Sequence, residues 1–459
     1  MGKAARRLSL IQAALLVAMF ACRLAPARAQ ETATRPEPQR VTSLGDSLKR
    51  VEKRQLHIFY VHGMAADGPG FSESKVLRSS ICKQLKDCTS PEGEFDGREY
   101  ADKDKFALNA DPPKLSYLGQ PIWQSRKDGP PSEGWKASAP FVDHWKLART
   151  GAAPTIYVDE INWWPLVFAV KCRQIVAQDA ALVGPGAAFI DKCSHLELDP
   201  NNPGRFRSYS WIEPDDAPAL KALPTRGALI NRSVKNSVLD WGFTDAVLSV
   251  GPLRSLLLEG IRQLVLKSVD VAADGTRGGG VGPLPNQEFV IVSHSLGSYL
   301  IFSALDLPPP PPAPSDPAPA DDWKIRFENV LRHTSMVYFF ANQLRLLELA
   351  NLDVTAGENM VQHLEAWGRL RRDFIKSLPA ADATSPGAPI PPQIVAWSDP
   401  SDLLSWNVPD LRTVLVKNLT VRNAIHWFWL IENPAAAHAN YATNHRVIGA
   451  MLKPTKPPR

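Results

Sequence analysis

The stretch Phe289-Val290-Ile291-Val292-Ser293-His294-Ser295-Leu296-Gly297-Ser298 contains the change of pattern that decides the fold. Its first four residues are apolar and mostly β-branched, which favours a short buried strand. Leu296–Leu305 then follows a helical, largely apolar pattern. A strand that passes so directly into a helix needs a very sharp turn, with small residues two positions before and after Ser295. Such a turn lifts the Ser295 hydroxyl above the sheet, at the amino end of the helix, where developing negative charge is favoured.

The segment Ser293-His294-Ser295-Leu296-Gly297 resembles the nucleophile elbow of the α/β-hydrolase superfamily, in which G-x-S-x-G joins a strand to a helix. Ser293 stands where the family usually has Gly, and Ser is still small enough for the turn. The resemblance implies a mostly parallel sheet flanked by helices, with Ser295 as the nucleophile. A hydroxyl with its ordinary pKa is a poor nucleophile at neutral pH, so a base must lie elsewhere in the chain.

The resemblance implies that an acid and then a histidine follow the nucleophile in the chain. Asp399 and Asp402 both come after the predicted strand Gln393–Trp397. Asp402 is favoured, because the family's acid typically lies several residues beyond the strand end. Asp399 is the alternative, although the sequence Asp-Pro-Ser also suits a side chain that closes a turn.

The histidine is expected on a loop between the last predicted strand, Val421–Leu430, and a final helix at about 444–452. His438 occupies such a loop of small residues, 36 positions after Asp402. His445 is the alternative, but it lies at or inside the helix, where a structural role suits it better.

An oxyanion hole requires two N–H donors. The resemblance implies that Leu296, directly after the nucleophile, supplies one of them. The other is expected from the loop after an early strand, and His62-Gly63-Met64 follows the predicted strand Leu56–Val61. Gly63 would let the backbone turn inward, and Met64 N–H is the candidate second donor.

The domain is predicted to cover residues 53–452, followed by a short tail at 453–459. The 232 residues between Gly63 and Ser295 exceed what the core of the fold requires, so a cap or lid insertion is expected within about 65–285.

Three segments within this domain carry further expectations. Residues 90–150 have weak periodicity and many Gly and Pro, and we predict surface loops there. Trp163-Trp164 either lines an apolar pocket or belongs to the core. Eight prolines between 308 and 319 predict an extended insertion.

The first 29 residues have the pattern of an export signal. A cationic start precedes Leu8–Ala21, which is too short to span a bilayer as a stable helix, and Ala27-Arg28-Ala29 places small residues at a cleavage site. An N-terminal anchor is the alternative. The mature chain is expected to begin near Gln30 with a polar leader over 30–52, to be periplasmic or secreted, and to have no stable membrane span.

The charge balance argues against a nucleic-acid partner. The chain has 52 Lys and Arg against 47 Asp and Glu, but five of the cations and no acid lie in the first 29 residues, so the remainder is neutral. No His-Glu-x-x-His or Rossmann glycine pattern is present, and we expect neither a metal nor a cofactor.

Four cysteines remain beyond the export signal. Their spacing suggests the pairs Cys82–Cys88 and Cys172–Cys193, but sequence alone leaves the pairing open, and four free thiols are the alternative.

Together these features predict an exported serine hydrolase that cleaves carboxylic or lipid esters. The same triad serves thioesterases and acyltransferases, and a non-catalytic envelope binding protein or an adaptor acting through its proline tract are further interpretations. An acid beside His438 distinguishes the enzyme from the binding protein. The acyl chain, the alcohol and the oligomeric state stay open.

Overall fold

The computed structural model of the chain describes residues 42–50, 55–64, 73–101, 116–117, 120–121, 139–150, 155–171, 242–251, 253–269, 287–304, 322–348, 360–378, 389–423, 426–427, 431–432 and 434–453. All of these belong to one compact unit, Val41–Lys456. The predicted export signal, the proline tract 308–319, the pair Cys172–Cys193 and much of the expected cap lie outside the described residues.

An eight-stranded sheet forms the centre of the fold, with the order β10-β9-β8-β7-β1-β6-β5-β2. Its strands in chain order are β1 (Gln55–Val61), β2 (Glu94–Tyr100), β5 (Phe141–Leu147), β6 (Ile156–Asn162), β7 (Gln287–His294), β8 (Thr334–Phe340), β9 (Gln393–Ser398) and β10 (Leu415–Thr420). The six neighbours from β10 to β6 are parallel, whereas β5 is antiparallel to β6 and β2 to β5. The predicted mostly parallel sheet is therefore confirmed.

Two short antiparallel ladders lie outside this sheet. They pair β3 (Ser116–Tyr117) with β4 (Gln120–Pro121), and β11 (His426–Trp427) with β12 (Ile431–Glu432).

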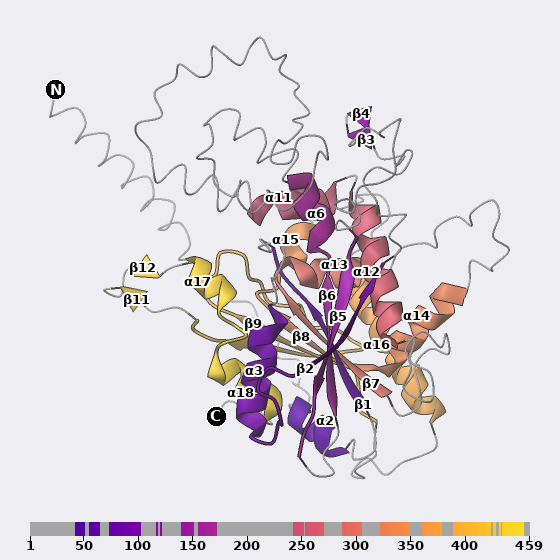
Figure 1. Cartoon of the computed structure of the whole chain (residues 1–459), viewed down its shortest axis with the longest axis vertical. Helices are drawn as coiled ribbons and strands as arrows, with labels where there is room; N and C mark the ends of the chain where they lie inside the picture. The colour runs from indigo at the N-terminus through magenta and orange to yellow at the C-terminus, as the bar shows by residue number, and fades with distance from the viewer. Residues whose placement is uncertain are drawn as a thin grey trace, which may run out of the picture. The chain divides into compact units, whose positions relative to one another are not determined.

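Helices cover both faces of the sheet, as Figure 1 shows. One face carries α2 (Leu44–Arg50), α3 (Ser74–Leu85) and α18 (His445–Leu452). The other carries α12 (Arg254–Val269), α13 (Leu296–Ala304), α14 (Asp322–His333) and α16 (Met360–Ser377). The shorter helices are α6 (Trp164–Lys171), α11 (Thr244–Val250), α15 (Leu344–Glu348) and α17 (Pro434–Ala439).

The central strand β7 shows why its sequence is apolar without alternation. Phe289 and Ile291 enter the core under α12 and α13, while Val290 and Val292 enter the core under α3 and α18. A parallel strand covered on both faces buries every side chain, and all eight residues of β7 are buried.

The last strand of the sheet lies earlier in the chain than the sequence predicted. We expected it at Val421–Leu430, but β10 ends at Thr420, residues 421–423 are not in a strand, and β11 begins at His426. β10 is an edge strand with mostly exposed or half-buried side chains, so its sequence is polar. The segment after β10 is more apolar, and for that reason the sequence predicted the strand there.

The prediction of surface loops over 90–150 was also wrong. β2 and β5 lie there and extend the sheet from β6. β2 is the opposite edge strand and is largely exposed, and its pairing with β5 is irregular between Phe95 and Gly97. An exposed edge strand buries few side chains, so it shows little hydrophobic periodicity.

The described part of 65–285 contributes three strands of the sheet, so that interval is only partly available for a cap. Residues 44–50 of the expected polar leader form α2, whose Leu44 and Leu48 are buried in the core beside α18. Cys82, near the end of α3, forms a disulfide with Cys88.

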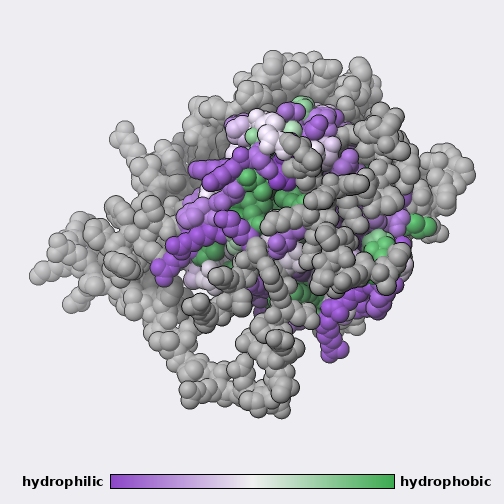
Figure 2. Space-filling model, turned by 90° about the horizontal axis from the view of Figure 1, so that it is seen from below, coloured by the Kyte–Doolittle hydropathy of each residue, from purple (hydrophilic) through white to green (hydrophobic). Residues whose placement is uncertain are grey.

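Within the part of the chain that the structure describes, no helix has both the length and the apolar character needed to cross a membrane. On the face seen in Figure 2, the described residues are mainly hydrophilic and their apolar side chains form small separate patches.

Candidate active site

The site lies where the direction of strand addition reverses. β1 and β7 are neighbours, but the chain after β1 builds the β6 side of the sheet, whereas the chain after β7 builds the β8 side. Ligands of open parallel sheets bind at the carboxyl ends of the strands at such a switch point. His62-Gly63-Met64 follows β1 and Ser295 follows β7, so both sequence candidates meet there.

Ser295 adopts a backbone conformation that L-residues other than Gly rarely take. Its φ is 53°, between the end of β7 and the first residue of α13. Its N–H donates to the carbonyl oxygen of Phe340 at the end of β8, at 2.8 Å. The conformation carries a cost of about 1–3 kcal/mol and marks a site where the surroundings impose the turn.

The small residues around the nucleophile have a steric reason. A Cβ at Gly297 would overlap the carbonyl oxygens of Val61 and His62, so α13 can start this close to β1 only with Gly. Ser293 is completely buried, and its hydroxyl donates to the Ser298 hydroxyl at 3.1 Å. The Ser293 hydroxyl is thus accommodated inside the turn with a partner.

Ser295, His438 and Asp402 form one chain of hydrogen bonds. His438 Nε2 lies 2.7 Å from Ser295 Oγ, and His438 Nδ1 lies 2.8 Å from Asp402 Oδ1. Because a carboxylate only accepts, Nδ1 carries the proton and Nε2 accepts from the serine hydroxyl. The imidazole is 17% exposed and the carboxylate 1%. The three residues come from the end of β7, the loop after β9 and α17.

The Asp402 carboxylate is fixed by two further contacts. Its Oδ1 also accepts from the backbone N–H of Leu404 at 2.9 Å, and its Oδ2 accepts from the Tyr441 hydroxyl at 3.1 Å. Tyr441 in turn accepts from the N–H of Asp399 at 2.7 Å. Burial and the negative charge of Asp402 raise the pKa of Tyr441, so its hydroxyl stays a donor.

Asp399 lies in the turn and not against the imidazole. Its Oδ1 accepts from Ser401 N–H at 2.9 Å, and its Oδ2 accepts from Asn423 N–H at 2.6 Å. It thereby ties the acid loop to the segment after β10. His445, the alternative histidine, is the exposed first residue of α18. The structure therefore brings together Ser295, Asp402 and His438.

The two segments that carry the expected oxyanion donors border the same serine. Leu296 is the first residue of α13, and the first N–H groups of a helix have no acceptor within the helix. A Cβ at Gly63 would lie 3.0 Å from the Cβ of Ser295, so the backbone after β1 runs directly past the nucleophile. Gly63 N–H donates to Glu73 Oε2 at 3.2 Å, and Met64 N–H is the next donor along.

Trp163 supports this loop from the core. It is completely buried, stacks on the His62 ring at 4.6 Å, and donates its indole N–H to the His62 carbonyl oxygen at 3.1 Å. Burial lowers the pKa of His62 to about 4, so the ring is neutral at pH 7. Trp163 and Trp164 both belong to the core cluster, which answers the question that the sequence left open.

A carboxylate–imidazole pair that sequence reasoning missed, Glu73–His294, lies beside the Asp402–His438 pair. Glu73 Oε1 contacts His294 Nδ1, and His294 Nε2–H donates to the backbone carbonyl oxygen of His438 at 2.8 Å. Burial alone would raise the pKa of Glu73, but the His294 charge lowers it to about 2. Burial alone would lower the pKa of His294, but Glu73 raises it above its ordinary value.

This pair links the oxyanion loop to the base, because Glu73 also holds Gly63 N–H. His294 lies inside the elbow motif, so its neighbour Ser295 could have drawn attention to it. Glu73 lies just before α3, and only the fold shows that it faces the site.

A comparison of the chain with protein-family models and with curated proteins gave no match. The chemistry of the site therefore rests on its own geometry. Among the described residues, no group of three or more His, Cys, Asp or Glu side chains is arranged to hold a metal ion.

Proposed function

We propose that the chain is a serine hydrolase of the α/β-hydrolase type that cleaves carboxylic or lipid esters through an acyl-enzyme. One observation carries the proposal: the hydrogen-bonded series Asp402–His438–Ser295, with Ser295 held at a positive φ between a buried strand and a helix. The order Ser, Asp, His along the chain and the mostly parallel sheet support the same family.

In the acylation step, Ser295 Oγ attacks the ester carbonyl carbon while its proton passes to His438 Nε2. The imidazolium that forms is stabilised by Asp402, which keeps Nδ1 protonated and the ring in place. The oxyanion accepts hydrogen bonds from the N–H groups of Leu296 and Met64, and each such donor typically contributes about 10²–10³ in turnover. Collapse of the intermediate breaks the C–O bond, and the leaving alcohol takes the proton from Nε2.

In the deacylation step, water attacks the acyl group and gives its proton to the same nitrogen. The second intermediate expels Ser295 Oγ, which recovers the proton, and the carboxylic acid leaves. The serine, the imidazole and the carboxylate are then in their starting states, so the cycle needs no other group.

A non-catalytic binding protein does not need an acid beside His438. The 2.8 Å contact with Asp402, and the Leu404 N–H and Tyr441 hydroxyl that hold its carboxylate, favour the enzyme. Thioesterases and acyltransferases share this triad, so products must separate these activities from ester hydrolysis.

The test is labelling of the protein by a fluorophosphonate probe, together with hydrolysis of p-nitrophenyl esters of increasing chain length. We expect labelling and turnover in the wild type and neither in Ser295→Ala. Labelling that persists in Ser295→Ala would refute the assignment. Acyl-CoA substrates, with and without an added alcohol, distinguish a thioesterase and an acyltransferase from an esterase.

Export and a cap belong to the same proposal. We propose cleavage after Ala29, release into the periplasm or the medium, and a cap formed from the parts of 65–285 outside the sheet. Amino-terminal sequencing of the protein recovered from the cell envelope or the medium tests the first point, and an uncleaved Met1 would contradict it.

A further inference from the structure

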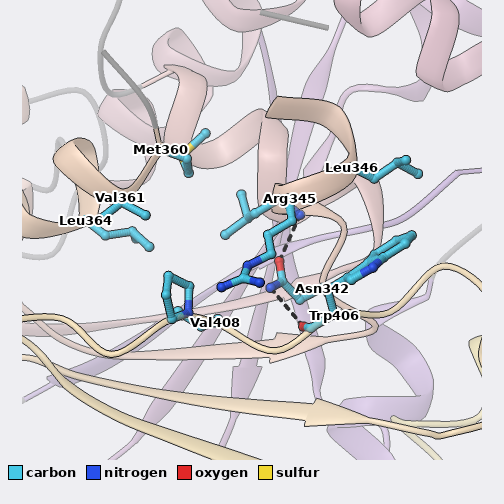
Figure 3. A pocket seen from close by; sticks show the side chains of 10 residues that line it. Asn342, Arg345, Leu346, Met360, Val361, Leu364, Trp406 and Val408 are labelled. Atoms are coloured by element: carbon cyan, nitrogen blue, oxygen red, sulfur yellow. Dashed lines mark hydrogen bonds between the residues drawn. The ribbon is translucent and has the colours of Figure 1, made fainter. Parts of the chain in front are cut away.

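A cavity of about 560 Å³ is lined in part by the segments that follow the carboxyl ends of β8 and β9. It lies between α15, the beginning of α16 and the loop that follows β9 (Figure 3). Its walls are mostly apolar, with Met360 and Leu364 from α16 and Trp406 and Val408 from the loop. A cavity of this size and lining suits a small organic group.

Two of the chain segments that line the cavity also carry contacts of the candidate triad. Ser295 N–H is bonded to the carbonyl oxygen of Phe340, and Asn342, a wall residue, is two residues further along. Two residues of extended chain span about 7 Å, so this wall begins within about 10 Å of the serine backbone. Trp406, another wall residue, follows Asp402 by four residues. Its backbone N–H donates to the Asn342 carbonyl oxygen at 3.0 Å, so these two wall residues are neighbours.

Arg345 is the charged residue among those that line the cavity. Figure 3 shows its side chain extending into the space toward Val408. No ion pair or hydrogen bond of its guanidinium is found among the described residues, and none of the described lining residues is acidic. A guanidinium stays charged at any physiological pH and has five N–H donors for an anion.

The amino end of α16 adds positive charge to the cavity wall. Met360 and Val361 are the first residues of the 18-residue helix α16, so its amino end borders the cavity. The helix dipole places partial positive charge at that end. Apolar walls with two positive groups, and with no negative group among the described lining residues, favour a ligand that is apolar along its length and anionic at one end.

We propose that this cavity is the acyl-binding site of the enzyme and that it takes an acyl chain ending in a carboxylate, which Arg345 binds. The inference rests on the proposed ester hydrolysis and names its substrate class: monoesters of dicarboxylic acids. Trp406 and Leu364 contact the methylene chain, and the ester carbonyl reaches Ser295.

The experiment compares two substrate series of matched chain length. One contains p-nitrophenyl monoesters of succinic, adipic and suberic acid, and the other contains the neutral p-nitrophenyl butanoate, hexanoate and octanoate. We expect kcat/KM to be higher for the anionic ester at one chain length at least. Arg345→Gln should lower kcat/KM for that ester about ten- to a hundredfold, as expected for a lost hydrogen bond to a charged group, and change the neutral series less than about twofold.

Arg446→Gln is the matched control, because Arg446 is an exposed arginine on α18, on the other face of the sheet. It removes the same charge and should leave both series unchanged. Arg345→Lys keeps the charge but not the planar donor pair, and an intermediate loss is expected.

The outcomes separate the two proposals. If the wild type hydrolyses neutral esters through Ser295 but shows no preference for the anionic series, or if Arg345→Gln affects both series alike, the acyl-site inference is wrong and the hydrolase proposal stands. If no ester is cleaved, the hydrolase proposal fails, and binding of free suberate to the full chain by calorimetry decides the cavity alone. Binding that Arg345→Gln weakens and Arg446→Gln does not would still support the anion site, and no binding would refute it.

Discussion

Apart from the Glu73–His294 pair, the sheet has two carboxylate–imidazole sites whose hydrogen bonds are similar in length. At the first, Asp402 Oδ1 lies 2.8 Å from His438 Nδ1. At the second, Asp159 on β6 lies between two rings, 2.6 Å from His144 Nδ1 on β5 and 3.1 Å from His57 Nδ1 on β1. Hydrogen-bond length therefore does not separate a site that can do chemistry from one that cannot.

What differs is the position along the strands and the partner of the second ring nitrogen. Asp159 and its two histidines are strand residues and are almost completely buried. His57 Nε2 has no hydrogen-bond partner among the residues that the structure describes. His438 lies beyond the strands, is partly exposed, and directs Nε2 at a serine hydroxyl. Burial alone would raise the pKa of Asp159, but the hydrogen bonds from His144 and His57 outweigh burial, and the pKa is lowered overall. This carboxylate therefore stays charged inside the sheet. The comparison indicates a catalytic pair at the strand ends and a structural one within the sheet.

The largest effect is expected for Ser295→Ala, which removes the nucleophile from the first site. We expect kcat/KM for p-nitrophenyl esters to fall at least about 10⁴-fold, because the imidazole and carboxylate then have no hydroxyl to activate. The melting temperature should stay the same or rise, since the strained φ of 53° remains but a buried polar group is lost. If the variant kept a tenth of the activity, Ser295 would not be the nucleophile and the Asp402–His438 pair would not be catalytic.

Asp402→Asn tests whether the carboxylate of the first site acts through the ring. Asn can donate to Nδ1 and would stabilise the wrong tautomer, so kcat is expected to fall about 10³–10⁴-fold while KM changes little. Asp399→Asn is the matched control, three residues earlier in the same loop. It should lower activity far less, and mainly through stability, because Asp399 accepts backbone N–H bonds and does not touch His438.

Asp159→Asn makes the corresponding change at the second site, and the expected effect is on stability. We expect the free energy of unfolding at pH 7 to fall by about 3 kcal/mol, since two buried imidazoles lose the carboxylate that accepts their hydrogen bonds, while kcat/KM of the folded fraction changes less than about threefold. The folded pKa of Asp159 lies below its ordinary 3.8, so its contribution is present above that pH and is lost as the pH falls through the lower folded value. Denaturant titrations from pH 7 to pH 3 should show the two proteins converging only below about pH 4.

The first site could be predicted from sequence because its residues stand in a fixed order. Ser295 has a steric signature in its small neighbours, and Asp402 follows β9, which is parallel to β8 and β7. His438 comes after both in the chain, but it lies in the helix α17 and not on the loop that the sequence predicted. The second site has no such signature. His57, His144 and Asp159 lie on three strands whose pairing depends on the register, and β5 was not recognised as a strand at all.

The edges of the sheet were mispredicted for a related reason. β2 and β10 bury little surface, so their sequences resemble loops, while the apolar run after β10 resembles a strand. Only the central strands, covered on both faces, carry a hydrophobic pattern strong enough to read. Glu73 shows the same limit at the site, because a single acidic residue at the start of a helix indicates no partner until the fold brings His294 to it.

The smallest effect is expected for Glu73→Gln, which breaks the pair that joins the two sides of the first site. Glu73 raises the pKa of His294, so without the carboxylate charge this pKa falls. The hydrogen bond from His294 Nε2–H to the His438 carbonyl oxygen then weakens. We expect kcat/KM at pH 7 to fall about tenfold, through kcat more than KM, as for a loss of positioning. Glu73→Asp keeps the charge and should recover part of the loss.

The pH profile gives this prediction its sign. The pKa of Glu73 is lowered from 4.5 to about 2, so its contribution is present above pH 4.5 and is lost toward pH 2. The pKa of His294 is raised above 6.5, so its contribution is complete below pH 6.5 and is lost as the pH rises through the folded value. The difference in melting temperature between wild type and Glu73→Gln should therefore be largest near pH 5–6 and shrink toward pH 9. A constant difference would mean that the pair acts as a neutral hydrogen bond, and that only Asp402–His438 carries charge at this end of the sheet.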